Sequence, residues 1–178
     1  MTLQPVPTRL VVMGVAGCGK SSLGQHGAQA LGLPLLEGDD FHPAANVAKM
    51  RAGIPLSDDD RAAWLDTLAE QLAQRPDGVV LTCSSLKRRY RDRLRAAAPG
   101  LRFVFLQLSR EQARERVATR PGHVFPVSLV DSQFEALEDP SAEPGVLPLD
   151  AMRPIPELVS AVAQWVRSAP APMQAVKA

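Results

Sequence analysis

A run of eight residues near the start of the chain has the residue types and the spacing of a phosphate-binding loop. It reads Gly14-Val15-Ala16-Gly17-Cys18-Gly19-Lys20-Ser21 and satisfies the pattern G-x-x-x-x-G-K-[ST] at every position. In such a loop the glycines let backbone N–H groups surround the α- and β-phosphates, while Lys20 reaches the β- and γ-phosphate oxygens. The Ser21 hydroxyl supplies a ligand for Mg²⁺, and Ser22 completes the nucleotide contacts. The segment predicts a site for ATP or GTP with Mg²⁺.

The sequence on either side of this loop favours the same interpretation. Residues 9–13 form an apolar, strand-like run and residues 21–31 have a helical pattern, so the loop joins a strand to a helix. A chance match in a glycine-rich turn lacks that context. The dinucleotide fingerprint G-x-G-x-x-G fits poorly, because Ser22 stands where its third glycine belongs.

Length and composition limit the classes of protein that fit. The chain has 178 residues, of which 46% are hydrophobic, and this suits one globular domain, residues 1–178. Its 20 basic and 19 acidic side chains leave a formal charge of +1, so no overall field attracts nucleic acid or a membrane surface. Cys18 and Cys83 are too few for a disulfide framework, and no stretch approaches the ~20 apolar residues of a membrane span. We expect a cytoplasmic protein with no nucleic-acid or membrane partner.

Strand-like and helix-like segments alternate along the chain. The strand-like segments are Leu10–Met13, Pro34–Glu37, Gly78–Cys83, Leu101–Leu108 and Val146–Asp150, and helical patterns begin near Lys20, Pro43, Leu86, Arg110 and Ile155. Because neighbouring parallel strands need helical crossovers, this order predicts a three-layer α/β fold with a five-stranded, mostly parallel sheet. We expect a helical insert at about 43–76, a mobile lid at about 116–130 and a frayed Ala/Pro-rich tail at 169–178.

Carboxylates at the end of the second strand are candidates for the chemistry of phosphoryl transfer. A kinase needs a carboxylate that orients the acceptor hydroxyl or takes its proton. Glu37 and Asp39 are two residues apart, and we expect the second strand to lie near the first, so both side chains face the phosphates. Capping of the next helix by Asp39 or Asp40 is an equally good alternative.

Other polar clusters have simpler explanations. The triple Asp58-Asp59-Asp60 follows Ser57 and precedes an apolar helical pattern, which favours a capped helix start over a metal site. The three histidines are scattered and accompany no Cys/His cluster, so a zinc site is not expected.

Basic residues after the third and fourth strands are candidate anion ligands. Lys87 and Arg91 line one side of a predicted helix whose positive N-terminus lies near Ser84, a setting that suits a small carboxylate better than nucleic acid. Arg116 and Arg120 flank a Pro-Gly break, where a basic flap could close over ATP, add positive charge and exclude water. Surface salt bridges are the alternative for both arginines.

Long stretches of the chain resemble the gluconokinase family. Residues 38–65 read GDDFHPAANVAKMRAGIPLSDDDRAAWL, similar to the family pattern G-D-x-x-H-P followed by K-M-x-x-G-x-P-L-x-D-x-D-R-x-x-W-L. Residues 83–95 (CSSLKRRYRDRLR), 120–125 (RPGHVF) and 132–138 (SQFEALE) also resemble family segments. The matches span roughly residues 11–149, which is nearly the whole domain.

The resemblance implies an enzyme that phosphorylates D-gluconate at its 6-hydroxyl with ATP and Mg²⁺, in the fold class of shikimate and adenylate kinases. It also suggests a homodimer. Asp39 is then the group that orients or deprotonates the hydroxyl, while Lys20 and Arg120 neutralise the transferred charge. The expected substrate ligands are Asp39, His42, Lys49, Arg61, Ser84, Lys87, Arg91 and Gln133. A kinase of another small acceptor, such as shikimate or a nucleotide, is the alternative, whereas a GTPase would require an N-K-x-D motif that the chain lacks.

The sequence departs from the family pattern at a few positions. Cys18 replaces a common Ser in the loop, Ser85 replaces a typical Ala, and Val124-Phe125 replaces Phe followed by a variable residue. Glu37 stands where Asp is frequent, so the arm that carries this carboxylate is longer.

Overall fold

The computed structural model describes residues 7–121 and 125–168. Its strands are β1 (Arg9–Met13), β2 (Leu35–Glu37), β3 (Val79–Thr82), β4 (Arg102–Gln107) and β5 (Val146–Asp150). Its helices are α1 (Lys20–Leu31), the 3₁₀ helix η1 (Gly38–Phe41), α2 (Ala44–Arg51), α3 (Asp58–Ala73), α4 (Arg88–Ala97), α5 (Arg110–Thr119), α6 (Ser128–Ala136) and α7 (Ile155–Ser168). Residues 122–124 of the predicted lid and the predicted frayed tail, 169–178, lie outside the described residues.

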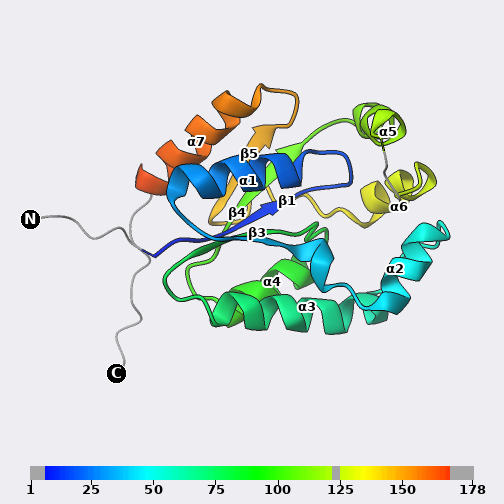
Figure 1. Cartoon of the computed structure of the whole chain (residues 1–178), viewed down its shortest axis with the longest axis horizontal. Helices are drawn as coiled ribbons and strands as arrows, with labels where there is room; N and C mark the ends of the chain where they lie inside the picture. Colours follow the sequence, from blue (N-terminus) through cyan, green and yellow to red (C-terminus); the bar gives the residue numbers. More distant parts are fainter. Residues whose placement is uncertain (1–6, 122–124, 169–178) are drawn as a thin grey trace, which may run out of the picture.

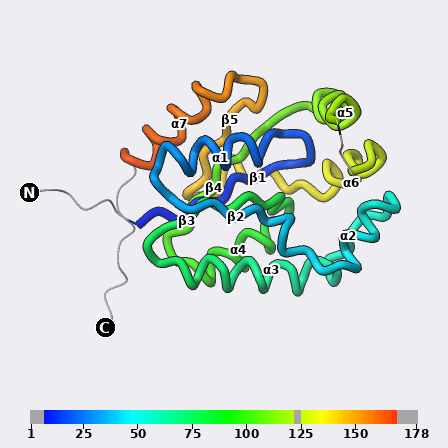
Figure 2. Tube along the Cα trace, in the orientation of Figure 1, coloured from blue at the N-terminus to red at the C-terminus, as the bar shows by residue number. Residues whose placement is uncertain are grey.

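The helices form layers on both faces of the sheet (Figure 1). α1 and α7 cover one face, and α3 and α4 cover the other. α2, α5 and α6 lie beyond the end of the sheet toward which β1 points (Figure 2). This arrangement confirms the predicted three-layer α/β fold.

The sheet is parallel throughout, with the strand order β2-β3-β1-β4-β5. Val11 of β1 pairs with Leu81 on one side and Phe103 on the other. The second strand lies near the first but does not pair with it, because β3 separates them. All five carboxyl ends still lie at one edge of the sheet, where ligands of parallel α/β proteins bind.

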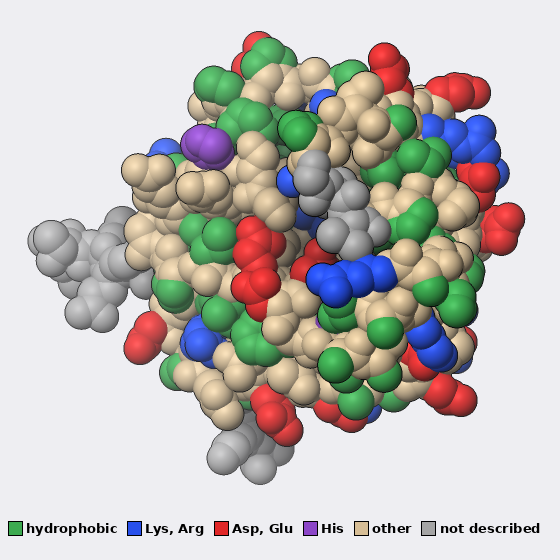
Figure 3. Space-filling model, turned by 45° about the vertical axis from the view of Figure 1, so that its right-hand side comes forward, with side chains coloured by type: hydrophobic (Ala, Val, Ile, Leu, Met, Phe, Trp, Pro, Cys, Tyr) green, Lys and Arg blue, Asp and Glu red, His purple; other side chains and the backbone are tan. Residues whose placement is uncertain are grey.

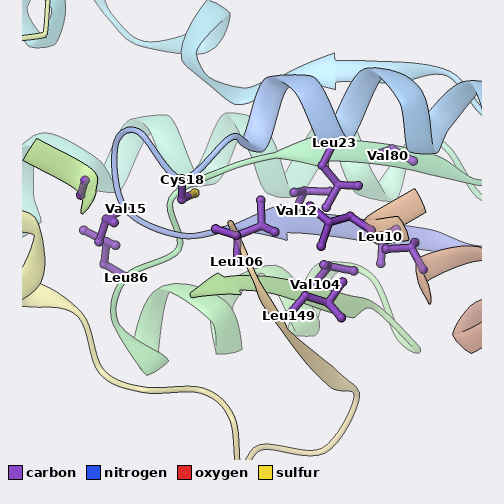
Figure 4. Packing of buried hydrophobic residues seen from close by; sticks show 14 of the residues in the cluster. Leu10, Val12, Val15, Cys18, Leu23, Val80, Leu86, Val104, Leu106 and Leu149 are labelled. Atoms are coloured by element: carbon purple, nitrogen blue, oxygen red, sulfur yellow. The ribbon is translucent and has the colours of Figure 1, made fainter. Parts of the chain in front are cut away.

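Alternate side chains of the strands enter two separate cores. Leu10 and Val12 pack toward α1 and α7 together with Val80, Val104 and Leu23 (Figure 4). Val11 and Met13 belong to the second core, which the apolar faces of α3 and α4 complete. Burial on both faces explains why these strands read as continuous apolar runs.

The acidic triplet forms the predicted helix start. The Ser57 hydroxyl accepts a hydrogen bond from the Asp60 N–H, and the Asp60 carboxylate accepts one from the Ser57 N–H, so the two residues form a capping box at α3. Within the described part of the chain, no three His, Cys, Asp or Glu side chains gather in a way that could hold a metal ion. None of the helices in residues 7–121 and 125–168 combines the length and apolar character that a membrane crossing requires.

Candidate active site

A cavity of about 220 Å³ opens at the carboxyl end of the sheet. Its walls come from the loop before α1, from η1, from the connection of α2 to α3, and from the segment that joins α5 to α6. Acidic and basic side chains lie next to each other near the middle of this face of the molecule (Figure 3). Segments far apart in the sequence thus contribute to one site.

The loop between β1 and α1 forms one wall of the cavity. Gly14 has φ +145°, and a Cβ there would lie 2.7 Å from the Cys18 sulfur, so the tight entry to the loop requires glycine. The Lys20 amine donates hydrogen bonds to the carbonyl oxygens of Gly14 and Val15, at 3.0 and 3.1 Å. This places the lysine charge across the concave side of the loop, where it can meet phosphate oxygens.

Oxygen ligands lie together at the start of α1. The Ser21 hydroxyl donates to Glu37 Oε2 at 3.1 Å, and the Thr82 hydroxyl donates to the same oxygen at 2.5 Å. Thr82 lies on β3, between β2, which carries Glu37, and β1, which leads into the loop before Ser21. Because the side chain of Glu37 is longer than that of Asp, its carboxylate can reach Ser21 from an edge strand. A carboxylate beside a hydroxyl is the kind of oxygen pair that suits Mg²⁺.

The two lid arginines occupy different positions. Arg120 lines the cavity together with Lys20. Arg116 donates to the carbonyl oxygens of Gly17, at 3.2 Å, and Ala151, at 3.0 Å, and so joins the phosphate-binding loop to the turn after β5. Arg116 thus shapes the loop, whereas Arg120 faces the reaction space.

Asp39 and His42 form the opposite wall. Asp39 lies on η1 with a side chain that is 87% exposed and borders the cavity. β2 ends at Glu37 and η1 begins at the next residue, so Asp39 reaches the cavity from η1 and not from a strand. His42 Nε2 lies 3.8 Å from Asp39 Oδ1, and its ring stacks on Trp64. Burial lowers the pKa of His42 and the Arg61 charge adds to this, while Asp39 opposes it, so the ring is neutral near pH 7.

Arg61 is the basic side chain on the acceptor side of the cavity. Its guanidinium donates to the Leu56 carbonyl oxygen at 2.8 Å and lies 5.7 Å from the centre of the Tyr90 ring. Among the described residues it has no carboxylate partner within ion-pair distance. Its charge remains available to an anionic ligand.

Two lysines predicted as substrate ligands are engaged elsewhere. The Lys49 amine pairs with Asp60 at 2.8 Å, and the Lys87 amine pairs with Asp58 at 3.1 Å. Neither lysine lines the cavity. The hydrogen bonds from Lys49 and from the Ser57 N–H lower the pKa of Asp60 to about 2. In this structure each lysine ties the start of α3 to a neighbouring element, and their roles as substrate ligands stay predictions.

Arg91 is not at the cavity either. It is fully buried, its guanidinium pairs with Glu143, and it also donates to the Ser85 carbonyl oxygen at 2.7 Å. The predicted helix is present as α4, but Arg91 is buried in the interior of the protein and does not face the cavity. Ser84, just before this network, does line the cavity, and its carbonyl oxygen accepts from the Gly14 N–H at 3.3 Å.

Gln133 lines the cavity from α6 and accepts a hydrogen bond from the Ala16 N–H at 2.6 Å. Several apolar wall residues, Trp64 among them, were not predicted as site residues from the sequence. The signal was available, because Trp64 lies inside the same motif as Arg61. The missed wall residues are Met50, Pro55, Leu56, Trp64, Val117, Phe125 and Leu129.

Comparison with known proteins finds similarity over most of the chain. A family model described as an AAA domain matches residues 10–143. The thermosensitive gluconokinase of Escherichia coli (strain K12) is 44% identical over 136 residues, which cover 75% of this chain and 73% of that protein. The gluconokinase of Gluconobacter oxydans (strain 621H) is 45% identical, covering 79% and 81%.

A solved structure extends the similarity to three dimensions. The crystal structure of a gluconokinase from Sinorhizobium meliloti 1021 superposes with a TM-score of 0.84 and 47% identity, covering 92% of this chain and 94% of that one. Sequence motifs and fold therefore agree, and the chain belongs to the gluconokinase family of P-loop kinases.

Proposed function

We propose that this protein transfers the terminal phosphoryl group of ATP to the 6-hydroxyl of D-gluconate. The observation that carries the proposal is a single cavity with the phosphate-binding loop on one wall and Asp39, His42 and Arg61 on the other. A kinase must hold its two substrates in line, and these walls are suited to a polyphosphate and to a small hydroxylated anion.

The nucleotide side suits ATP with Mg²⁺. The loop of residues 14–21 would surround the phosphates, and Ser21 with Glu37 would hold the metal ion. When bound, Mg²⁺ would shield the phosphate charges that otherwise repel an attacking oxygen. Lys20 and Arg120 border the same space and would stabilise the charge that spreads over the transferred group.

On the acceptor side, each group has a distinct task. The 6-hydroxyl oxygen forms a bond to the γ-phosphorus while the bond from that phosphorus to the ADP oxygen breaks, and the hydroxyl proton passes to Asp39. Arg61 would pair with the gluconate carboxylate at the far end of the sugar acid. Ser84 and Gln133 border the cavity with polar groups that suit the intermediate hydroxyls.

The test is an assay that couples ADP release to a colour change, run with gluconate, other sugar acids, shikimate and nucleoside monophosphates. We expect turnover with gluconate to exceed turnover with every other acceptor. Turnover confined to shikimate or to a nucleotide would replace gluconate as the substrate and leave the nucleotide side of the proposal intact.

The cysteines support a cytoplasmic setting for this reaction. Cys18 and Cys83 are both free and buried, as expected in a reducing compartment. Burial raises the pKa of the Cys83 thiol to about 11, which keeps it protonated and unreactive. The homodimer suggested by the family resemblance is tested by light scattering of the purified chain.

A further inference from the structure

The ring of His42 is held on three sides. Its side chain is 4% exposed and stacks on Trp64, with ring centroids 4.1 Å apart and planes 15° from parallel. The Trp64 indole N–H donates to the Gly38 carbonyl oxygen at 2.8 Å, which fixes the stack against η1. Ring atom Nε2 faces Asp39, and Nδ1 lies 3.3 Å from the side-chain nitrogen of Asn46. The plane of the ring is fixed, and its polar neighbours decide which nitrogen carries the hydrogen.

The side chain of Asn46 determines which ring nitrogen of His42 carries the hydrogen. It is a buried polar side chain on α2, and its amide nitrogen lies 2.8 Å from the backbone carbonyl oxygen of Asp60. A carbonyl oxygen only accepts hydrogen bonds, so the amide nitrogen of Asn46, and not its amide oxygen, must face Asp60. The second hydrogen of the same nitrogen is donated to His42 Nδ1. Nδ1 is therefore the acceptor, and the neutral ring carries its hydrogen on Nε2.

We infer that Asn46 is a positioning residue, which fixes the Nε2–H tautomer of His42 so that this N–H faces Asp39. The inference rests on the proposed function only for its consequence in catalysis. The tautomer itself follows from the two hydrogen bonds of Asn46.

The orientation of the N–H matters because Asp39 is otherwise exposed. At 3.8 Å, the His42 N–H attracts the Asp39 carboxylate, and a shift of about 1 Å would bring the two atoms to hydrogen-bond distance. In the opposite tautomer, a nitrogen lone pair would face the carboxylate and repel it. Asn46 thus favours the rotamer in which Asp39 points toward the His42 side of the cavity.

The first test is a ¹⁵N NMR measurement of the histidine rings in the protein without substrates. In the wild-type protein we expect His42 Nδ1 to resonate as the nitrogen without hydrogen and Nε2 as the nitrogen with hydrogen. In Asn46→Ala we expect a mixture of the two tautomers. A wild-type ring with its hydrogen on Nδ1 would overturn the inference, and this outcome requires no variant to fold.

The second test compares kinetics in Asn46→Ala with a matched control. We expect Asn46→Ala to lower kcat for gluconate about tenfold with little change in KM, because the base is misplaced while the binding groups remain. The control, Lys49→Met, removes the other bond between α2 and Asp60, and we expect it to lower stability without changing the His42 tautomer.

Two results would contradict the role of Asn46: wild-type tautomer and kcat in Asn46→Ala, or an equal loss of the tautomer in Lys49→Met. Absence of gluconate turnover in the wild-type protein would reject the proposed function instead, and the NMR result would stand independently of it.

Discussion

Asp39 lines the cavity with an exposed side chain, and among the described residues only the His42 ring lies within 4 Å of its carboxylate as a basic partner. A carboxylate so placed is well suited to accept a proton from an incoming hydroxyl. We expect Asp39→Asn to lower kcat by about 10²- to 10⁴-fold, because general-base catalysis contributes that range. ATP affinity, measured by calorimetry, should stay near the wild-type value. Near-normal turnover in this variant would remove Asp39 from the base role.

Arg61 provides a charge that Lys49 and Lys87 cannot, since both lysines are paired with aspartates. We expect Arg61→Ala to lower kcat/KM for gluconate about 10- to 100-fold, because a hydrogen bond to a charged group is worth ~1.5–3 kcal/mol. The loss should be much smaller for a six-carbon polyol without a carboxylate, so the variant should discriminate less between the two acceptors. Lys87→Met is the matched control and should keep the wild-type preference. An unchanged preference in Arg61→Ala would show that the carboxylate binds elsewhere.

For individual residues, the motif spacing correctly placed Lys20, Asp39, His42 and Arg61 at the cavity, although their roles stay predictions. Motif spacing did not predict that Arg91 is buried, because the charge of this residue and its position along the helix are those expected of a substrate ligand. The buried charge of Arg91 is paired with Glu143, a residue 52 positions away, and no local sequence pattern reveals that contact.

Among the elements, η1 depends on how closely it approaches β3. A Cβ on Gly38 would overlap the carbonyl oxygen of Thr82, so the backbones touch at the point where Asp39 is placed. We expect Gly38→Ala to lower the free energy of unfolding by about 1–3 kcal/mol, the usual cost of overpacking, and to reduce turnover by displacing η1.

Gly27→Ala is the control for this prediction. Gly27 lies inside α1 with no atom within 4 Å of an added Cβ. We expect a gain in stability of about 0.5–1 kcal/mol, because alanine is the better helix former. Urea unfolding measures both changes, and a neutral Gly38→Ala would contradict the close approach.

The existence of the elements was predictable from the sequence, but the order of the strands was not. Sequence patterns indicated the five strands and a capped helix start next to Ser57, because these are local effects of residue type. The position of β2 at the sheet edge depends on the path of its crossover, which is not encoded in any single segment. The second strand was predicted to end at Glu37, as it does, but the 3₁₀ helix that carries Asp39 was not predicted, because it depends on the close approach of Gly38 to β3.

Across the whole molecule, a buried ionic cluster joins α4 to the segment before β5. The Glu143 side chain is 8% exposed and accepts from Arg91 and, at 2.7 Å, from Arg95. Burial opposes its ionisation, yet the hydrogen bonds from both arginines outweigh burial and lower the pKa of Glu143. Arg91 also donates to the Ser85 carbonyl oxygen, so the cluster supports the loop that carries Ser84.

We expect Glu143→Gln to lower the free energy of unfolding by about 3–5 kcal/mol, because it leaves the buried Arg91 charge without its counter-ion. The control is Glu157→Gln, which breaks an exposed pair with Arg153 and should cost about 0.5 kcal/mol or less. Urea denaturation at neutral pH measures both. Equal effects of the two substitutions would mean that the buried cluster adds nothing beyond a surface pair.

The central position of β1 in the sheet separates the strand that carries the phosphate-binding loop from the segment that carries the acceptor groups. The strand that carries the phosphate-binding loop is paired on both sides, whereas η1 and α2 follow β2, an edge strand with one neighbour. The segment that follows β2 is thus attached to the sheet through one neighbouring strand, and Glu37 at the end of β2 is its direct contact with Ser21. In such a fold, substitutions near the edge strand can change the specificity for the acceptor, while the central strand keeps the loop that binds the nucleotide.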